Sequence, residues 1–205
     1  MPDSAISRER RERVRRVLAG RLASVVVIIE SVRRRHNTSA ILRTAEAFGL
    51  HEVHLVTGSF RPARGASRGA ERWLELHRHA EVGPCIAALQ ARGFRVLIAD
   101  LADDSFTPEN VPVDRPVALL FGSETAGVSD EARALADGVI TVPMDGLTES
   151  LNVSTAAACL ISRVAQRRRT AFGPDLEPER QDAFYTDWVD RESEARAGAR
   201  ARTEE

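Results

Sequence analysis

The chain has 205 residues, of which 43% are hydrophobic and 29% charged, a globular composition that excludes collagen-like, low-complexity and wholly disordered proteins. This length suits one hydrophobic core rather than two. All 29 basic residues are arginine, which excludes Schiff-base catalysis by lysine and the phosphate-binding lysine of a P-loop.

The net charge of -1 conceals an uneven distribution of arginine. Residues 1–36 carry ten arginines against four acids, and residues 150–173 carry four arginines and no acid. Two concentrations of positive charge on an otherwise acidic chain favour a partner with a phosphate backbone. Two solvated helix faces would explain the same pattern, and a GC-rich genome would explain the preference for arginine.

The sequence indicates a cytoplasmic protein without a membrane partner. No apolar run approaches the roughly 20 residues of a membrane span, and no signal-peptide core follows the basic N-terminus. The two cysteines, Cys85 and Cys159, are far apart and have no partners at metal-ligand spacing, which indicates reduced thiols.

In chain order, the pattern first predicts a charged helix at 6–19 and a strand at 24–30. The strand is a nearly continuous β-branched run, typical of a parallel sheet covered on both faces. A helix follows, with Asn37 as its N-cap and Gly49 at its end. Three apolar residues of this helix are expected to face the core: Ile41, Ala45 and Phe48.

The rest of the chain continues to alternate between strand and helix. A strand at 52–56 precedes a long loop at 57–80, rich in glycine, arginine and serine, with one short extended piece. The elements predicted next are helix 84–92, strand 94–100, strand 116–122, helix 129–137, strand 138–143 and helix 152–164. A last amphipathic helix at 178–194 precedes a tail at 198–205 that we expect to be disordered. This order predicts an α/β fold, a mostly parallel sheet with helices on both faces.

Three segments that follow predicted strands contain more polar residues and glycine than a connection requires. Ligands of α/β folds bind beyond the carboxyl ends of the strands, so these segments are candidates for a site. The first contains Asn37 and the solvent-facing Arg43, and the second, 121–127, combines two glycines with Glu124. The third contains Ser150, Asn152 and Ser154. Each also has an ordinary explanation as a helix cap, a tight turn or a surface arginine.

Several other chemistries lack their sequence patterns. The chain lacks the GxGxxG fingerprint of dinucleotide binding. Its one G-x-S-x-G match, at 65–69, lies within the predicted loop at 57–80 and not at the strand-to-helix turn that forms the nucleophile elbow of α/β-hydrolases. None of the five histidines has a carboxylate or cysteine at ligand spacing along the sequence. Dinucleotide chemistry, a hydrolase triad and metal catalysis are therefore unsupported.

Taken together, the three segments resemble the three motifs of the SPOUT-class RNA 2′-O-methyltransferases, and most closely those of the TrmH group. They are N-x-x-x-x-x-R-T-A-x-A-x-G, L-F-G-x-E-x-x-G-V-S and V-P-M-x-G-x-x-x-S-L-N-V-S-x-A-A-A. The resemblance covers residues 8 to about 170. It implies a C-terminal trefoil knot, a homodimer, and S-adenosylmethionine as the methyl donor without a metal. TrmH proteins methylate the ribose 2′-hydroxyl of guanosine 18 in the tRNA D-loop, so the implied partner is tRNA.

The resemblance also implies roles for individual residues. It places Asn37, Arg43, Glu124, Ser150 and Asn152 in the active site. It places Gly122, Ile140, Met144, Ser150 and Leu151 around the cofactor. In this family the arginine matching Arg43 is held to activate the hydroxyl. Because arginine stays protonated, we hypothesise that Arg43 instead binds the adjacent phosphate and stabilises developing charge, while a phosphate oxygen or water takes the proton.

The charge distribution and the resemblance together suggest a division of the chain. A basic helical arm at 1–20 would precede a methyltransferase domain at 21–172, with a helical extension and tail at 173–205. The arginines expected to contact RNA are Arg8, Arg10, Arg11, Arg15, Arg16, Arg167 and Arg168.

Three other functions are compatible with the sequence. Within the same enzyme class, the target could be a ribosomal RNA ribose, because the motifs fix ribose methylation more firmly than they fix the RNA. From another class, the chain could be a non-catalytic RNA-binding protein that retains the fold. A phosphoryl-transfer enzyme is a more distant third, given the lack of lysine and of a metal-binding carboxylate pair.

Overall fold

The computed structural model describes residues 6–56 and 69–201. The chain divides into two compact units, Leu22–Gly173 and the combination of Met1–Arg21 with Pro174–Glu205. The first unit contains the sheet, and the second contains the first and last helices of the chain. Among the described residues, no helix has the length and apolarity required to cross a bilayer.

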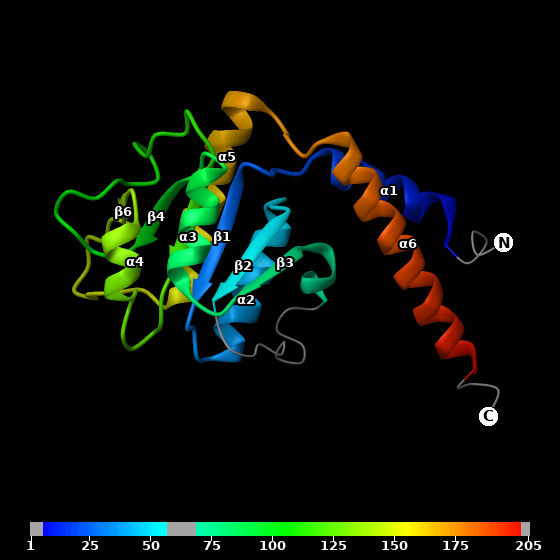
Figure 1. Cartoon of the computed structure of the whole chain (residues 1–205), viewed down its shortest axis with the longest axis horizontal. Helices are drawn as coiled ribbons and strands as arrows, with labels where there is room; N and C mark the ends of the chain where they lie inside the picture. Colours follow the sequence, from blue (N-terminus) through cyan, green and yellow to red (C-terminus); the bar gives the residue numbers. More distant parts are fainter. Residues whose placement is uncertain (1–5, 57–68, 202–205) are drawn as a thin grey trace. The chain divides into compact units, whose positions relative to one another are not determined.

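Six strands of the larger unit form one sheet in the order β3-β2-β1-β5-β4-β6 (Figure 1). They are β1 (Val25–Glu30), β2 (Glu52–Val56), β3 (Glu75–His79), β4 (Arg95–Ala99), β5 (Val117–Phe121) and β6 (Gly138–Ile140). Every pairing between these strands is parallel, which confirms the predicted sheet. All residues of β1, β2 and β5 are buried, because neighbours cover both faces of these strands.

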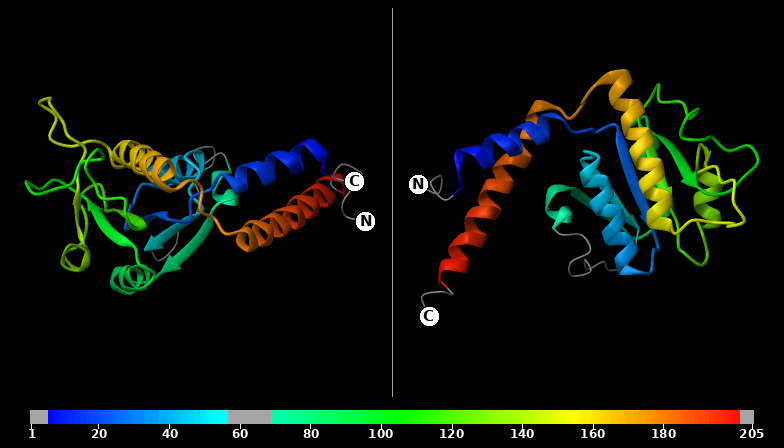
Figure 2. Two further views of the ribbon diagram at one scale, coloured as in Figure 1. Left: turned by 90° about the horizontal axis from the view of Figure 1, so that it is seen from above. Right: turned by 180° about the vertical axis from the view of Figure 1, so that it is seen from behind.

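Helices cover both faces of the sheet, as the alternation predicts (Figure 2). On one face, α2 (Arg35–Ala47) and α5 (Val153–Phe172) pack together in a core that includes Ile41 and Leu160. On the other face, α3 (Val82–Ala91) and the short α4 (Asp130–Leu135) enclose a second cluster around Ile86. A 3-10 turn, η2 (Ala70–Trp73), precedes β3. The part of the predicted loop at 57–68 lies outside the described residues.

Two details of the prediction for α2 are wrong. The helix begins at Arg35 with Arg34 as its N-cap, so Asn37 lies in the first turn with its side chain available for tertiary contacts. Phe48 is the C-cap and is 40% exposed, whereas Leu42 is fully buried in the core. Gly49 has a φ of 79° and follows the helix end, as expected of a residue in the left-handed region.

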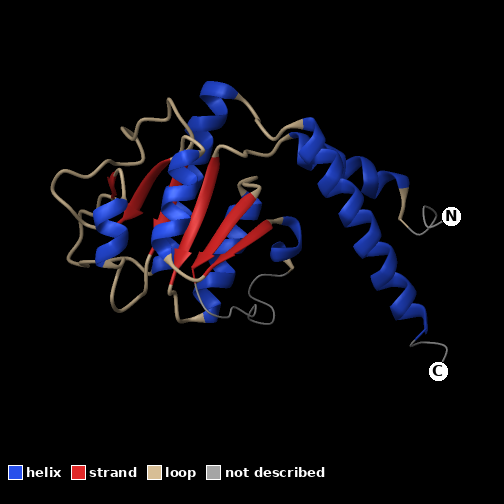
Figure 3. Ribbon diagram, viewed as in Figure 1, coloured by secondary structure: helices blue, strands red, loops and turns tan. Residues whose placement is uncertain are grey.

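The smaller unit contains α1 (Arg8–Ala19) and α6 (Pro178–Ala201), which contact each other (Figure 3). The Ser7 hydroxyl caps α1 by accepting a hydrogen bond from the backbone N–H of Arg10. The helix α6 ends at Ala201 and so includes the first residues of the tail at 198–205, and the disorder of that tail stays a prediction. Residues 202–205 lie outside the described part of the chain.

Candidate active site

The carboxyl ends of β4, β5 and β6 surround a cavity of about 450 Å³. Its walls include Ala99, Phe121 and Ile140 at the strand ends, together with the turn after β5, the segment at 141–152 and the first turns of α5. Pockets for small organic ligands typically measure about 300–1,000 Å³. The cavity therefore has the size and the position expected of a ligand site in a parallel α/β fold.

The turn after β5 brings bare backbone to the cavity. Ser123 and Gly127 exchange two backbone hydrogen bonds of 2.8 and 2.9 Å, and Gly127 has a φ of 69°. A Cβ atom at Gly122 would overlap the backbone of Gly127 and Val128. Gly122 and Gly127 therefore form a tight turn and also leave the backbone open to a ligand, because this turn is part of the cavity wall.

A chain of hydrogen bonds connects the three sequence motifs beside this cavity. The Asn37 side-chain amide donates to Glu124 Oε1 at 2.8 Å, and the amide of Asn152 donates to Asn37 Oδ1 at 3.3 Å. Asn152 is also the N-cap of α5, since its Oδ1 accepts from the backbone N–H of Ser154 at 2.9 Å. Residues 37, 124 and 152 are thus joined although they are far apart in the sequence.

Glu124 is the acceptor at one end of this chain. Besides the Asn37 amide, its carboxylate accepts the backbone N–H groups of Arg33 at 3.2 Å and Arg34 at 3.4 Å. Partial burial opposes ionisation, but the hydrogen bonds from Asn37 and the backbone outweigh it and hold the pKa of Glu124 below its ordinary value of 4.5. The carboxylate is therefore ionised at neutral pH and positions the start of α2 against the turn after β5.

Replacing Glu124 with glutamine should destabilise this contact in a pH-dependent way. The amide accepts the two backbone N–H groups less well and loses the charge that strengthens the bonds, at a cost of about 1 kcal/mol for a partly exposed group. Because the folded-state pKa is lowered, the wild-type advantage is complete above pH 4.5 and is lost as the pH falls through the folded-state value. Urea unfolding of both proteins between pH 3 and pH 7 measures the difference; a constant difference would contradict this role.

The structure brings most of the predicted site residues together. All five residues assigned to the cofactor line the cavity: Gly122, Ile140, Met144, Ser150 and Leu151. Glu124 and Asn152 line it as well, and Asn37 contacts both of them. Arg43 is the exception, because it is exposed on α2 and does not line the cavity of its own chain.

Sequence reasoning missed several residues in the cavity wall. Asp100 follows β4, accepts the backbone N–H of Leu101 at 2.8 Å and forms an ion pair with Arg133 of α4. Thr141 follows β6, and Arg34 precedes α2. The position of Asp100 and Thr141 just beyond parallel strands is the signal that could have identified them.

The structure contradicts the prediction that Arg168 contacts RNA. Its side chain is 8% exposed and donates to Ser24 Oγ at 2.9 Å and to the carbonyl oxygen of Val113 at 2.7 Å. Arg167 is half-buried and donates to the carbonyls of Pro108 at 3.0 Å and Val111 at 2.7 Å. These two arginines therefore attach α5 to the segment before β5, and an RNA contact by Arg167 stays a prediction.

Histidine and carboxylate side chains do pair, contrary to the expectation from their spacing. His54 Nε2 lies 2.7 Å from Oε1 of the buried Glu52, and Arg92 binds both oxygens of Glu52 at 2.6 and 2.9 Å. Burial opposes ionisation of Glu52, but the bonds from Arg92 and His54 prevail and hold its pKa far below the ordinary value. These residues lie on β2 and at the end of α3 and do not line the cavity.

A parallel sheet, a cavity at its carboxyl edge and a cluster of amide and carboxylate groups beside it define an α/β protein that binds a small organic cofactor. Comparison with known proteins gives the family. Residues 24–162 match the model of the SpoU rRNA Methylase family. The chain therefore belongs to the SpoU methylase family, which confirms the resemblance of the three motifs.

Individual relatives agree with this membership. The tRNA (guanosine(18)-2′-O)-methyltransferase of Thermus thermophilus is 41% identical over 186 residues, covering 88% of this chain and 95% of the relative. The TrmH/SpoU tRNA modifying enzyme of A. aeolicus matches with a TM-score of 0.81 at 29% identity, over 90% of this chain and 96% of that chain. The AdoMet-bound rRNA methyltransferase of Sinorhizobium meliloti matches with a TM-score of 0.65 at 26% identity, over 75% and 60%.

Proposed function

We propose that this chain transfers a methyl group from S-adenosylmethionine to the ribose 2′-hydroxyl of guanosine 18 in tRNA, and that it does so as a cytoplasmic homodimer. The observation that carries the proposal is the hydrogen-bonded chain from Glu124 through Asn37 to Asn152, which joins the three motifs beside one cavity. The relative from Thermus thermophilus, with 41% identity, bears the name of this reaction. The trefoil knot stays a prediction.

The residues of the cavity fit S-adenosylmethionine. Gly122 leaves open backbone where any side chain would collide with the turn, so hydrogen-bonding groups can approach a ligand closely. Ile140, Leu151 and Leu160 provide apolar surface for a base, and Ser150 provides a hydroxyl. S-adenosylmethionine supplies an electrophilic methyl group on a sulfonium, and this chemistry requires alignment with a nucleophile but no metal.

The remaining task of the protein is to prepare the ribose hydroxyl. Glu124 is a poor candidate for the general base, because it accepts hydrogen bonds from Asn37 and two backbone groups and has a lowered pKa. We assign it a positioning role. Arg43 would bind the phosphate next to the reacting ribose and stabilise negative charge on the oxygen, while a phosphate oxygen or water takes the proton.

A methyl-transfer assay tests the proposed function. Incubation with radiolabelled S-adenosylmethionine and bulk tRNA, followed by nucleoside mapping, should place the label on the ribose of guanosine 18. A tRNA with 2′-deoxyguanosine at this position is the matched control and should accept no label, because it lacks only the nucleophile. Label on another nucleotide or on a base would refute the proposal, and label on ribosomal RNA alone would replace the target.

Binding of tRNA should depend on salt through the arginines of α1. Arg8 and Arg16 are exposed, and Arg8 pairs with Glu12 of the same helix at 2.7 Å. Arg10 and Arg15 form ion pairs with Glu192 and Asp182 of α6, at 3.3 and 3.4 Å. Replacing both Arg8 and Arg16 with alanine should weaken binding. It should also reduce the slope of log affinity against log salt by about 0.7 to 0.9 for each phosphate that the protein no longer neutralises.

A second pair of substitutions changes the same surface in the opposite direction. Asp182→Asn and Glu192→Gln remove the acids that pair with Arg15 and Arg10, so the combined variant should bind tRNA more tightly at low salt. Filter binding of labelled tRNA across a salt series measures both effects. An unchanged slope in the arginine variant would exclude α1 from the tRNA-binding surface.

A further inference from the structure

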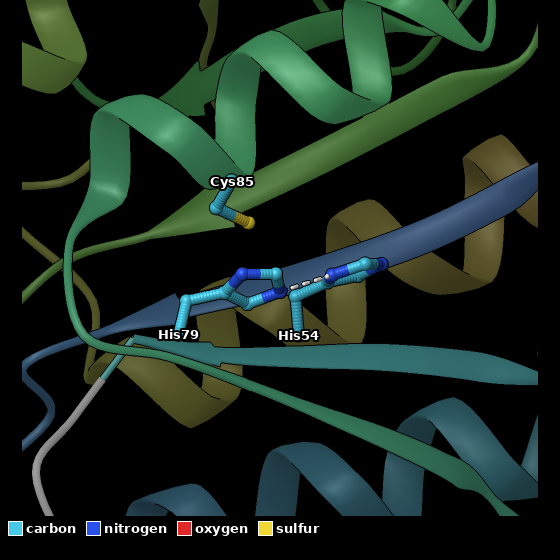
Figure 4. Close-up of side chains that lie close together, drawn as sticks. All are labelled: His54, His79 and Cys85. Carbon is cyan, nitrogen blue, oxygen red and sulfur yellow. Dashed lines mark hydrogen bonds between the residues drawn. The ribbon is translucent and has the colours of Figure 1, made fainter.

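Three potential metal ligands converge on one point at the β2–β3 side of the sheet, outside the candidate active site (Figure 4). His54 comes from β2, His79 from β3 and Cys85 from α3. Their ligand atoms all lie within 4.8 Å of one another, and His54 Nδ1 lies 2.8 Å from His79 Nε2. None of the three side chains lines the cavity. We propose that they form a binding site for Zn²⁺ or a similar borderline-soft divalent cation.

A tetrahedral zinc ion would bring the three ligand atoms to a spacing between the 2.8 Å of the two nitrogens and the 4.8 Å within which all three lie. Zinc bonds of about 2.0–2.1 Å to nitrogen and 2.3 Å to sulfur place neighbouring ligand atoms about 3.3–3.6 Å apart. The two imidazole nitrogens would separate by roughly half an ångström on binding, a change within the reach of small ring rotations. Imidazole and thiolate are ligands that zinc prefers, whereas Mg²⁺ and Ca²⁺ prefer oxygen.

Glu52 prepares His54 for this role. Its Oε1 lies 2.7 Å from His54 Nε2, and both of its oxygens are fixed by Arg92. An ionised carboxylate accepts a hydrogen bond from the N–H group at Nε2, so the proton of the neutral ring stays on Nε2 and Nδ1 carries the lone pair that faces His79 and Cys85. A carboxylate that orients a histidine in this way is the usual outer shell of a protein zinc site.

Cys85 packs in the hydrophobic cluster around Ile86, and its thiol lies beside the two histidines. Cys85 is fully buried and His54 is 5% exposed, whereas His79 is half-buried, so a cation would enter from the side of His79. On binding, the proton of His79 moves from Nε2 to Nδ1, and the Cys85 thiol releases one proton to solvent. Water would occupy the fourth position, and the ion would link β2, β3 and α3.

Titration of the full metal-free chain with Co²⁺ tests the site. We expect one ion per chain, with the visible absorption of a tetrahedral complex and a sulfur-to-cobalt charge-transfer band, and displacement of cobalt by Zn²⁺. Cys85→Ser should abolish the charge-transfer band, and both Cys85→Ser and His79→Gln should weaken binding by at least about tenfold. The matched control is Cys159→Ser on α5, which should leave the band and the affinity unchanged.

Stability provides a second measurement that separates binding from misfolding. Zn²⁺ should raise the melting temperature of the wild type and of Cys159→Ser, but not that of Cys85→Ser or His79→Gln. Methyl transfer by the variants in the absence of metal shows that they are folded. If the wild type binds no stoichiometric ion, or if the charge-transfer band survives Cys85→Ser and disappears in Cys159→Ser, the proposal is wrong. The metal-binding and melting outcomes do not depend on the proposed RNA target.

Discussion

Replacing Arg43 with alanine is expected to abolish methyl transfer while leaving the affinity for S-adenosylmethionine unchanged. Arg43 is exposed and lies outside the cavity wall, so its loss should not disturb the cofactor site. Removing a single group that stabilises developing negative charge lowers turnover by on the order of 100- to 1,000-fold. Single-turnover methylation and equilibrium binding of S-adenosylmethionine measure the two effects separately, and unimpaired turnover would exclude Arg43 from the mechanism.

Arg43→Lys is the informative companion to this variant. Lysine keeps the positive charge but not the planar fork that binds two phosphate oxygens, so we expect partial activity. Full activity in the lysine variant would show that charge alone is sufficient, and would contradict a bidentate phosphate contact.

Mixing two inactive variants tests how Arg43 reaches a reacting ribose. If Arg43 acts on the cavity of its partner in the proposed homodimer, an Arg43→Ala chain combined with an Asn37→Ala chain forms one intact site in each mixed dimer. Activity would then return on mixing. If both residues act within one chain, the mixture stays inactive, because neither chain has a complete set. The two results distinguish the arrangements without a structure of the complex.

Gly122→Ala is expected to remove S-adenosylmethionine binding. The added Cβ would meet the backbone of Gly127 and Val128, which cannot rotate away as a side chain could, so the turn after β5 must shift. Overpacking of this kind costs about 1–3 kcal/mol, and a shifted turn should lower cofactor affinity by more than about tenfold. Calorimetric titration with S-adenosylmethionine measures the loss.

Gly146→Ala is the matched control for this substitution. Gly146 belongs to the segment after β6, and its added Cβ would find no atom nearer than Thr148 N at 4.0 Å. We expect a change in stability below about 0.5 kcal/mol and unchanged affinity. If both alanine variants bind normally, the turn after β5 is not the rigid wall that the geometry indicates.

The sheet and its strands could be predicted because a strand that is buried on both faces consists of a continuous run of apolar residues. The runs at 24–30 and 116–122 are almost wholly apolar, and both contain fully buried strands. Helix boundaries were less certain, because a polar residue such as Asn37 serves equally well as a cap or as a tertiary ligand. Its bond to Glu124, 87 positions away, could not be read from local pattern.

The resemblance of the motifs predicts the residues of the site, but it does not predict which other polar side chains are buried or paired. Arg168 lies in a basic run that suggests an exposed surface, yet it faces carbonyl groups inside the protein. The pairing of His54 with His79 depends on the register that sets Val56 beside His79, and spacing along the chain contains no information about that register. Side-chain contacts between neighbouring strands are therefore difficult to predict from a single sequence.

The contact between Asn37 and Asn152 also determines how much of the chain must be synthesised before the active site can form. One partner emerges from the ribosome early and the other only after most of the chain has been made, and the walls of the cavity are spread over the same interval. A nascent chain that ends before α5 has no enclosed place for the methyl donor. Only chains whose synthesis has passed α5 can therefore transfer a methyl group. Products truncated before this helix should be inactive rather than partly active.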